Sequence, residues 1–313
     1  MRLKKPNFWD YRRISIGAIL LYPLSIIYLL LAWFSRIPSI FKTYKHPIPI
    51  ICVGNIYIGG TGKTPLAAEI FKFLKSGGKK PSFIKKHYDF LIDEIKMLSE
   101  IGDTYHIKNR SKAIELSKLN GNDVAVLDDG FQDFSIKPDF SILCFNSKQL
   151  IGNGLIIPSG PLREKLSAIS RADCIVINGD RTKEVFEFEK KITENLIKKK
   201  IHFFYSKYTI KDVESLKNKK ITAFAGIGNP SNFFDLLKEN KLDIKKTFSF
   251  SDHHKYSQSD FDQIRSDKST EIFTTKKDYF RLNDEQKEIC SYIEINLEIE
   301  NKDKLESLIK NAL

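Results

Sequence analysis

The residues with the clearest capacity for chemistry stand together between positions 59 and 64, in the order Gly-Gly-Thr-Gly-Lys-Thr. Glycines let backbone N–H groups turn inward around a phosphate, a lysine can reach the β- and γ-phosphates, and a threonine hydroxyl can hold Mg²⁺. An apolar run at 48–53 precedes this loop, and an amphipathic run at 66–74 follows it. The order strand, glycine loop, helix predicts a phosphate-binding P-loop rather than a glycine-rich turn with a surface lysine.

One position departs from the P-loop pattern G-x-x-x-x-G-K-[ST]. The pattern places its first glycine at position 57, where this chain has Tyr57, and the doubled Gly59-Gly60 could supply the missing flexibility. Lys63 would also act in catalysis, because it would neutralise the γ-phosphate. The predicted nucleotide-binding residues are Tyr57, Ile58, Gly59, Gly60, Thr61, Gly62, Lys63 and Thr64.

A strand-like run at 123–127 ends in a pair of carboxylates, Asp128 and Asp129. Downstream of a P-loop, an acidic residue at the end of a strand typically meets Mg²⁺ directly or through water. Adjacent residues of an extended chain point to different faces, so one aspartate can serve the metal and the other a water or the substrate. We take Asp128, with Thr64, as the metal ligand and Asp129 as the catalytic residue. The alternative is a plain Asp-Asp-Gly turn.

A later loop at 152–164 is rich in glycine and proline and could hold Arg163 or Glu164 over the nucleotide. Glu164 is the third predicted metal ligand. The alternative is a long connecting loop with a solvated arginine.

Strands and helices alternate along the rest of the chain, which predicts an α/β fold with a P-loop NTPase-like, mainly parallel sheet sandwiched by helices. A second, smaller α/β domain follows, and functional groups gather again where its strands end, at 252–254 and 275–278. The predicted parts are an N-terminal membrane-associated helix (1–40), a P-loop domain (41–205), a linker (206–220) and a second domain (221–313) that closes over the active site.

The segment 14–34 contains 21 uncharged, mostly apolar residues. A helix of this length is about 32 Å long, enough to span a bilayer. More basic residues precede the segment than closely follow it, so a spanning helix would place the P-loop outside the cytoplasm, away from ATP. We therefore expect a helix that lies in, or dips into, the cytoplasmic leaflet. The alternative is a very hydrophobic helix packed on the domain core.

The chain is basic, with 51 Lys and Arg against 39 Asp and Glu and a net charge of +12. This excess predicts attraction to an anionic partner, but charge alone does not choose between nucleic acid, an acidic membrane surface and a phosphorylated substrate. Solvated lysine runs, such as 198–200, account for part of it. Four cysteines without C-x-x-C spacing indicate a reducing compartment, and we expect Cys52, Cys144 and Cys174 to be buried.

With these motifs in place, the chain resembles the tetraacyldisaccharide 4′-kinase family over nearly its whole length. The combination of an Asp-Asp-Gly-Phe-Gln and an Asp-His-His motif in this order is more specific than the P-loop alone. The shared pieces, besides the apolar N-terminal segment, are Val53-Gly54-Asn55, Gly59 to Pro65, Leu127 to Gln132, Pro158 to Glu164, Arg171-Ala172-Asp173, Phe224 to Gly228, Asp252-His253-His254 and Thr275 to Asp278.

The resemblance implies ATP- and Mg²⁺-dependent phosphorylation of the 4′-hydroxyl of a tetraacylated glucosamine disaccharide 1-phosphate, the lipid A precursor, to give lipid IVA. It also implies a lipid substrate in the membrane, an anionic membrane surface as partner, no nucleic acid, and a monomer on the cytoplasmic face of the bacterial inner membrane.

Two pieces depart from the family pattern. Where the family has Ser-Arg-Gly-Tyr-Gly, this chain has Lys85-Lys86-His87-Tyr88-Asp89. The family's Gly-Asp-Glu-Pro, whose aspartate is implied to be the catalytic base, falls on Ile92-Asp93-Glu94-Ile95. Asp93 is therefore the candidate base, although a carboxylate in the first turn of a helix is also favoured by the helix dipole.

The second implied catalytic residue is His253, which would orient or hydrogen-bond Asp93 from the second domain when the domains close. The neighbouring His254 makes a metal site or a feature of a helix N-terminus the alternatives for this His-His pair.

Two other classes of function compete with the kinase. Thr275-Lys276-Lys277-Asp278 fits the guanine-reading [NT]-K-x-D pattern, which suggests a P-loop GTPase or metallochaperone-like switch. That motif lies more than two hundred residues after the P-loop, too far for a compact GTPase. The third candidate is a membrane-tethered basic scaffold whose P-loop has decayed at Tyr57.

Overall fold

The computed structural model describes residues 5–40, 46–88, 91–196 and 200–313. The chain forms two compact units and passes between them four times. Unit 1 comprises Met1–His87, Gly102–Lys207 and Ile299–Leu313, and unit 2 comprises Tyr88–Ile101 and Tyr208–Glu298. The segment 88–101, which the sequence analysis places in the P-loop domain, therefore belongs to unit 2.

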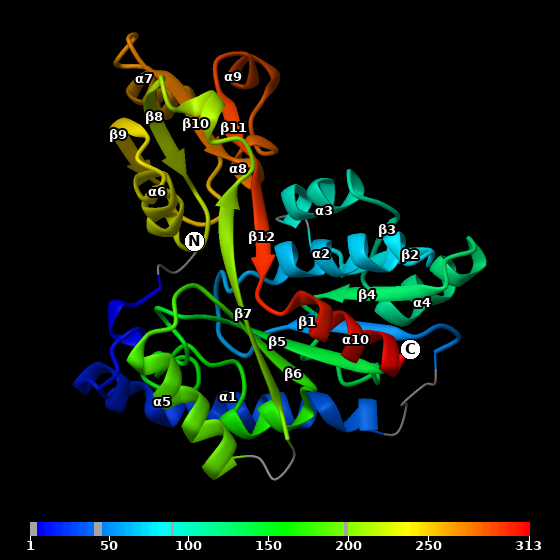
Figure 1. Cartoon of the computed structure of the whole chain (residues 1–313). Coiled ribbons are helices and arrows are strands. Elements are labelled where there is room, and N and C mark those ends of the chain that lie inside the picture. The colour runs from blue at the N-terminus through cyan, green and yellow to red at the C-terminus, as the bar shows by residue number, and fades with distance from the viewer. Residues whose placement is uncertain (1–4, 41–45, 89–90, 197–199) are drawn as a thin grey trace. The chain divides into compact units, whose positions relative to one another are not determined.

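Unit 1 is built on an eight-stranded sheet in the order β12-β7-β6-β5-β1-β4-β2-β3 (Figure 1). Every neighbouring pair from β3 to β7 is parallel. The central strands are buried at all positions, which is why their sequences are continuous apolar runs without alternation. The strands of this sheet are β1 (Ile50–Gly54), β2 (Pro81–Lys86), β3 (Thr104–Ile107), β4 (Val124–Asp128), β5 (Phe140–Asn146), β6 (Cys174–Asn178), β7 (His202–Ile210) and β12 (Ile295–Ile299). The end of β7 from Tyr208 and β12 as far as Glu298 are counted with unit 2.

Helices cover both faces of this sheet. One face carries a core cluster with side chains from α4 and α5, and Tyr28 and Leu29 of α1 pack against it. Figure 1 shows α2 on the opposite face, where it contacts β1, β2 and β4. The helical elements of unit 1 are η1 (Asn7–Trp9), α1 (Ile16–Ile40), α2 (Lys63–Ser76), α4 (Arg110–Leu119), η3 (Leu166–Arg171), α5 (Lys183–Lys191), the π-helical η4 (Ile192–Leu196) and α10 (Lys302–Ala312).

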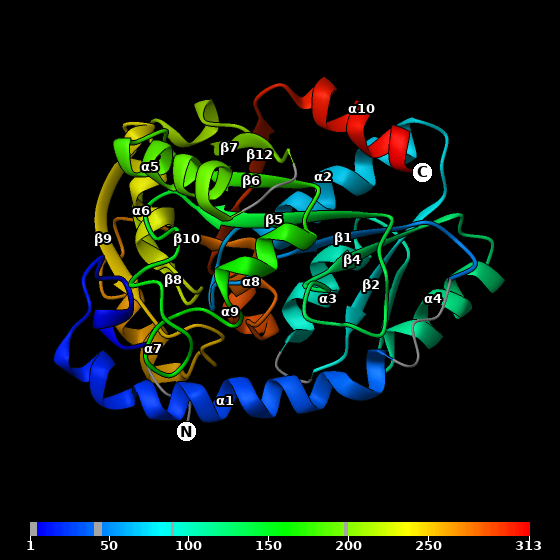
Figure 2. The same cartoon turned by 90° about the horizontal axis from the view of Figure 1, so that it is seen from below.

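The helix α1 is continuous from Ile16 to Ile40 (Figure 2). Its stretch Ile16–Ile37 has a mean hydropathy of 2.1 and is only 11% buried, so by length and composition it could cross a membrane. Its buried polar residue, Ser25, anchors it to unit 1: the hydroxyl donates to the Ile156 carbonyl (2.8 Å) and accepts from the Ser159 amide (3.1 Å).

Unit 2 has a four-stranded, fully parallel sheet in the order β11-β10-β8-β9. Two apolar clusters contain its core, one with Phe233 and Leu237 of α6 and one around Phe224 and Phe261. The inserted helix α3 contacts α8, which places segment 88–101 in this unit. The elements are α3 (Ile92–Ser99), η5 (Glu214–Leu216), β8 (Lys220–Ala225), α6 (Pro230–Glu239), β9 (Asp243–Ser249), α7 (Gln258–Ile264), β10 (Glu271–Thr275), α8 (Lys276–Tyr279), α9 (Asp284–Glu288) and β11 (Ser291–Ile293).

The two parallel sheets with their helices confirm the predicted fold class. The four cysteines are free and buried, and burial raises the pKa of the Cys52 thiol to about 12, so these residues act as small apolar side chains.

Candidate active site

The P-loop connects the end of β1 to the start of α2 at Lys63. Gly59 and Gly62 have φ angles of 128° and 90°, in the region that favours glycine, and Asn55 donates to the Thr61 hydroxyl across the loop (2.8 Å). The positive end of the α2 dipole and its free N–H groups therefore stand directly behind the glycines, as an anion site requires.

Tyr57, at the position of the missing glycine, lies fully buried beneath this loop. Its hydroxyl contacts the Asp10 carboxylate and accepts from Lys5 Nζ at 2.5 Å, and burial is the largest cause that raises its pKa. The amide of Ile58 donates to the Pro161 carbonyl (2.8 Å). These partners occupy the Tyr57 hydroxyl and the Ile58 amide, so neither group is available to a phosphate.

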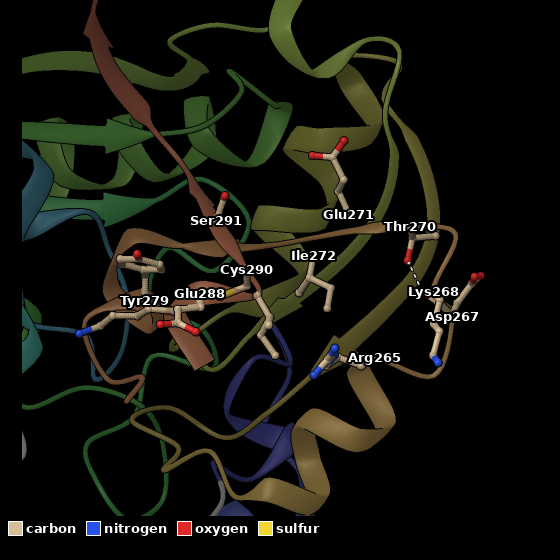
Figure 3. A pocket seen from close by; sticks show the side chains of 12 residues that line it. Arg265, Asp267, Lys268, Thr270, Glu271, Ile272, Tyr279, Glu288, Cys290 and Ser291 are labelled. Carbon is tan, nitrogen blue, oxygen red and sulfur yellow. Dashed lines mark hydrogen bonds between the residues drawn. The ribbon is translucent and has the colours of Figure 1, made fainter. Parts of the chain in front are cut away.

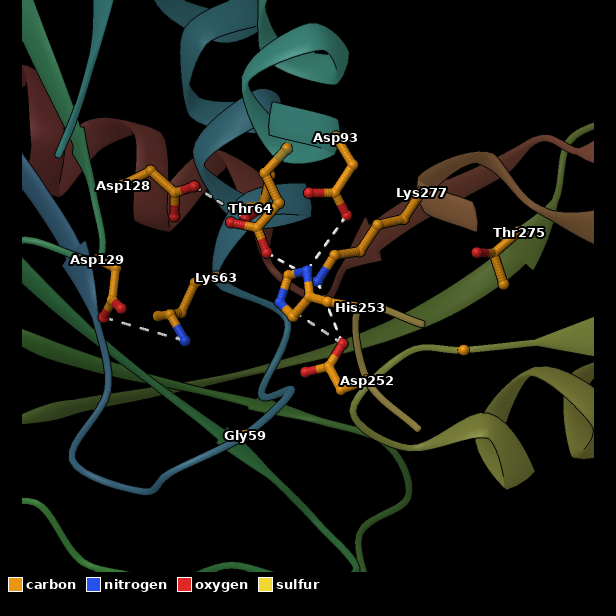
Figure 4. A network of polar contacts seen from close by, with 12 residues as sticks. Gly59, Lys63, Thr64, Asp93, Asp128, Asp129, Asp252, His253, Thr275 and Lys277 are labelled. Atoms are coloured by element: carbon orange, nitrogen blue, oxygen red, sulfur yellow. Dashed lines mark hydrogen bonds and ion pairs between the residues drawn. The ribbon is translucent and has the colours of Figure 1, made fainter. Parts of the chain in front are cut away.

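The predicted metal ligands Thr64 and Asp128 are brought together by the sheet. Val53 at the end of β1 pairs with Asp128 at the end of β4, and Thr64 follows in the first turn of α2. The Thr64 hydroxyl donates to Asp128 Oδ2 (2.8 Å), as Figure 4 shows. Asp128 is fully buried, and its Oδ1 has no hydrogen-bond partner among the described residues. A bare carboxylate oxygen beside a hydroxyl at the start of α2 fits Mg²⁺, which takes its remaining ligands from phosphate and water.

Asp129 turns to a different set of partners. Its φ angle of 59° turns the chain sharply after β4, and its carboxylate accepts from both Nη atoms of Arg163, at 2.8 and 3.3 Å, with Lys63 Nζ 4.0 Å away. Burial acts to raise the Asp129 pKa, but the charges of Lys63 and Arg163 prevail and hold it well below its usual range. The Asp129 carboxylate therefore pairs with Arg163 and lies near Lys63 beside the loop.

Glu164 departs from its predicted role as a metal ligand. It is 3% exposed, and both of its oxygens accept from Arg171 at 2.8 Å. Gln132 adds a bond to Oε1 (2.9 Å), and Arg36 of α1 adds one to Oε2 (3.1 Å). The correction has a simple physical reason, because a carboxylate already neutralised by two guanidinium groups has little charge left for a metal.

Unit 2 holds the predicted Asp93 and His253. Asp93 lies in the first turn of α3 and is 2% exposed. Its Oδ2 accepts from Nε of Arg281 at 2.8 Å and from a second Arg281 nitrogen, and His253 Nδ1 lies 3.5 Å from the same oxygen (Figure 4). The other oxygen, Oδ1, is buried without a hydrogen-bond partner among the described residues. Both residues belong to unit 2, so Asp93 does not come from the P-loop domain as the sequence analysis expected.

Cations set the ionisation of Asp93. Burial acts to raise its pKa, but the hydrogen bond from His253 and the charges of Lys277 and Arg281 lower it overall. Lys277 is itself paired with Glu94 at 2.8 Å. Asp93 is therefore an ionised carboxylate with one free oxygen, the form that a general base needs.

Arg281 is the residue that the sequence reasoning missed. Besides Asp93, it donates to Asp278 (2.9 Å) and to the Gly226 carbonyl (2.6 Å). The available signal was its i,i+3 spacing from Asp278 of the short helix α8, because Arg281 follows just after the end of that helix and reaches back to the buried aspartate.

The apparent guanine-reading motif is a structural feature of α8. Thr275 caps this helix by accepting from the Asp278 amide (3.1 Å). Asp278 is fully buried and also accepts from the Tyr256 hydroxyl (2.8 Å) and the Gly226 amide (3.0 Å). The Asp278 carboxylate is thus occupied within the fold and is not available to read a base.

The histidine pair divides between two roles. His254 pairs with Asp260 at 3.0 Å and stacks on Phe250, away from the partners of His253. In the part of the chain that the structure describes, no group of three or more His, Cys, Asp or Glu side chains is arranged to hold a metal.

A cavity of about 610 Å³ opens at another edge of unit 2 (Figure 3). It is lined by Glu271 and Ser291, the first residues of β10 and β11, whereas α8 follows the carboxyl end of β10. None of the predicted site residues lines this cavity.

The fold and the loop define a P-loop NTPase-like α/β protein. A family model described as tetraacyldisaccharide-1-P 4′-kinase matches residues 17–313. Tetraacyldisaccharide 4′-kinase of Pelagibacter ubique is 39% identical over 97% of this chain and 96% of its own length, and that of Francisella tularensis subsp. novicida is 30% identical over 94% and 98%. The chain belongs to the tetraacyldisaccharide-1-P 4′-kinase family.

A solved structure is also similar. The crystal structure of LpxK from Aquifex aeolicus, described as an "apo" form in complex with ATP, has a TM-score of 0.72 and 24% identity, and the match covers 94% of this chain and 99% of that one. It supports the same fold. The resemblance drawn from the motifs is confirmed, the chain is a kinase, and the GTPase-like alternative is set aside.

Proposed function

We propose that this kinase transfers the γ-phosphoryl group of ATP to the 4′-hydroxyl of a tetraacylated glucosamine disaccharide 1-phosphate, giving lipid IVA. Membership of the family supports the acceptor. The observation that carries the donor side is the Thr64–Asp128 contact behind the glycine loop, where Asp128 Oδ1 has no hydrogen-bond partner among the described residues.

The chain's own residues divide the work of phosphoryl transfer. The amides of the loop 59–64 and the Lys63 ammonium bind the phosphates, while Asp129 and Arg163 hold Lys63 in place. Thr64 and Asp128 would hold Mg²⁺, which supplies charge neutralisation at the β- and γ-phosphate oxygens. The electrostatic contribution of such fixed groups is large, because they are oriented before the reaction begins.

Asp93 is the proposed general base. Its Oδ1 accepts the proton of the 4′-hydroxyl, while Arg281 and His253 keep Oδ2 fixed and the carboxylate ionised. A base whose pKa lies below neutrality is present in its active form throughout the physiological range.

The acceptor and the helix α1 together support a membrane site of action. We propose that the protein acts as a monomer at the cytoplasmic face of the inner membrane, with the exposed apolar side chains of α1 in the leaflet. Leu20 and Leu31 are 74% and 65% exposed, and the exposed Arg13, before the helix, carries a positive charge that can meet anionic head groups.

The direct test uses purified protein, ATP-Mg²⁺ and the tetraacyldisaccharide 1-phosphate in detergent micelles, with the phosphorylated position read by NMR. The variant Lys63→Met should lose about 10²- to 10³-fold or more of the rate, since it removes one preorganised charge. Lys72→Met, on the exposed side of the same helix α2, is the matched control. Absence of 4′-phosphorylation by the wild type, or full activity of Lys63→Met, would overturn the proposal.

A further inference from the structure

Lys85 is a buried cation at the phosphate site for which the proposed mechanism has no role. It lies near the end of β2, directly opposite Asp128 of β4 in the parallel register. Its side chain is 3% exposed, that of Asp128 is fully buried, and Nζ lies 2.5 Å from Asp128 Oδ2. A lysine is buried to this degree only when a charged partner compensates the loss of water.

The bonds of Asp128 are divided unequally between its two oxygens. Oδ2 accepts from both Lys85 and Thr64, whereas Oδ1 has no hydrogen-bond partner in the described chain. Two donors on one oxygen fix the rotation of the carboxylate. As a result, Oδ1 is held in a single direction before any ligand arrives.

We propose that Lys85 is a positioning residue of the metal site: its ammonium fixes Asp128 through Oδ2 and thereby presents Oδ1 to the Mg²⁺ that accompanies the nucleotide. This inference rests on the proposed function, because it assumes that ATP-Mg²⁺ is the donor. Groups that orient a metal ligand in this way typically change metal affinity by about 10- to 100-fold when they are removed.

The functional test compares Lys85→Met, which keeps the length of the side chain without its charge, with Lys86→Met as the neighbouring control. The free Mg²⁺ concentration that gives half of the maximal rate at saturating ATP should rise about tenfold or more in Lys85→Met and less than about twofold in Lys86→Met. ATP affinity measured in EDTA should change less than about threefold, since Lys85 acts through Asp128 and not on the phosphates. An unchanged Mg²⁺ requirement, or a large loss of metal-free ATP affinity, would overturn the inference.

A second readout needs no activity. Lys85→Met leaves Asp128 buried without its cation, so the ligand-free protein should melt at a lower temperature, and Lys85→Met/Asp128→Asn should recover part of that loss. Additive losses would show that the pair does not interact. If Lys85→Met does not fold, the double variant must still fold for the inference to stand.

The two proposals fail in distinguishable ways. A wild-type protein that does not use ATP-Mg²⁺ refutes the proposed function. An active wild type with an unchanged Lys85→Met refutes only the role of Lys85.

Discussion

Asp128 in unit 1 and Asp93 in unit 2 have similar environments, but different parts of the chain supply the cations that hold them. Each is a buried carboxylate with one oxygen bonded to a cation and the other without a hydrogen-bond partner among the described residues. Strand register alone delivers Lys85 to Asp128. Arg281 reaches Asp93 from 188 residues further along the chain, through the packing of α3 against α8. A carboxylate with one oxygen held by a cation and the other oxygen available to a ligand therefore occurs in both units, at the proposed metal site and at the proposed base.

The largest effect is expected when the proposed base Asp93 or its partner His253 is replaced. Asp93→Asn and His253→Ala should each lower kcat by about 10²- to 10⁴-fold with little change in ATP affinity. Because the two act as a unit, the double variant should be scarcely worse than the worse single one. Steady-state kinetics with ATP binding by calorimetry checks this. Multiplicative losses would show that the residues act independently, and near-normal turnover of Asp93→Asn would refute Asp93 as the base.

A smaller effect is expected from the cation that holds Asp93. Arg281→Lys keeps a charge but loses the two-nitrogen contact, and we expect kcat to fall on the order of tenfold to a hundredfold, with Arg265→Lys, exposed in the same unit, as control.

The pH profile of kcat tests whether Arg281 lowers the pKa of Asp93. Arg281 is one of the groups that lower the Asp93 pKa, so Arg281→Gln should raise it, and the acidic limb of the kcat profile should move to higher pH. In the wild type, the stabilisation from ionised Asp93 is complete above the ordinary carboxyl pKa of about 3.9 and is lost as pH falls through the lowered value. A profile that does not move in Arg281→Gln would separate Arg281 from the base.

Substitutions on α1 should affect membrane binding without changing the environment of Asp128 or Asp93. Leu20→Glu/Leu31→Glu charges the exposed face of α1, and partition to anionic vesicles should fall on the order of tenfold, with a matching loss of activity on bilayer-embedded acceptor. The Mg²⁺ requirement and the pH profile in detergent should stay unchanged. Leu119→Glu, on the 83% exposed end of α4, is the control. The double substitution tests membrane binding more selectively than deletion of residues 1–36, because the deletion also removes the Arg36–Glu164 ion pair.

The smallest catalytic effect is expected at Glu164, because both of its carboxylate oxygens already accept hydrogen bonds. Glu164→Gln should change the Mg²⁺ requirement by less than about threefold. It should lower the melting temperature by several degrees, since Arg36 and Arg171 lose their shared partner. A Mg²⁺ requirement that rises as steeply as in Lys85→Met would restore Glu164 as a metal ligand.

Contiguous features were predictable from the sequence. The loop 59–64 and Asp128 follow from short motifs in the correct strand and helix context, and the structure places Thr64 and Asp128 in contact. The motif could not show that Tyr57 points toward Lys5 and Asp10, because those partners lie outside the pattern.

Features that depend on distant partners were less predictable. Glu164 resembles a ligand in sequence, and only the fold brings Arg36 and Arg171 to its oxygens. Segment 88–101 falls between two strands of unit 1, yet its packing against α8 decides its unit. The spacing of Arg281 from Asp278 indicates a local ion pair, but only the fold shows that Arg281 also contacts Asp93.

Unit 1 consists of three chain segments separated by the two segments of unit 2. This arrangement affects the order in which parts of the protein can fold during synthesis. The N-terminal part of a chain leaves the ribosome first, and contacts that are distant in sequence form late. The pieces of the phosphate loop, from β1 to Glu164, all lie in the first 164 residues. Asp93 emerges early too, but its arginine emerges only when the chain is nine-tenths complete. A nascent chain can therefore expose every residue of the phosphate loop before the arginine that holds Asp93 has been synthesised.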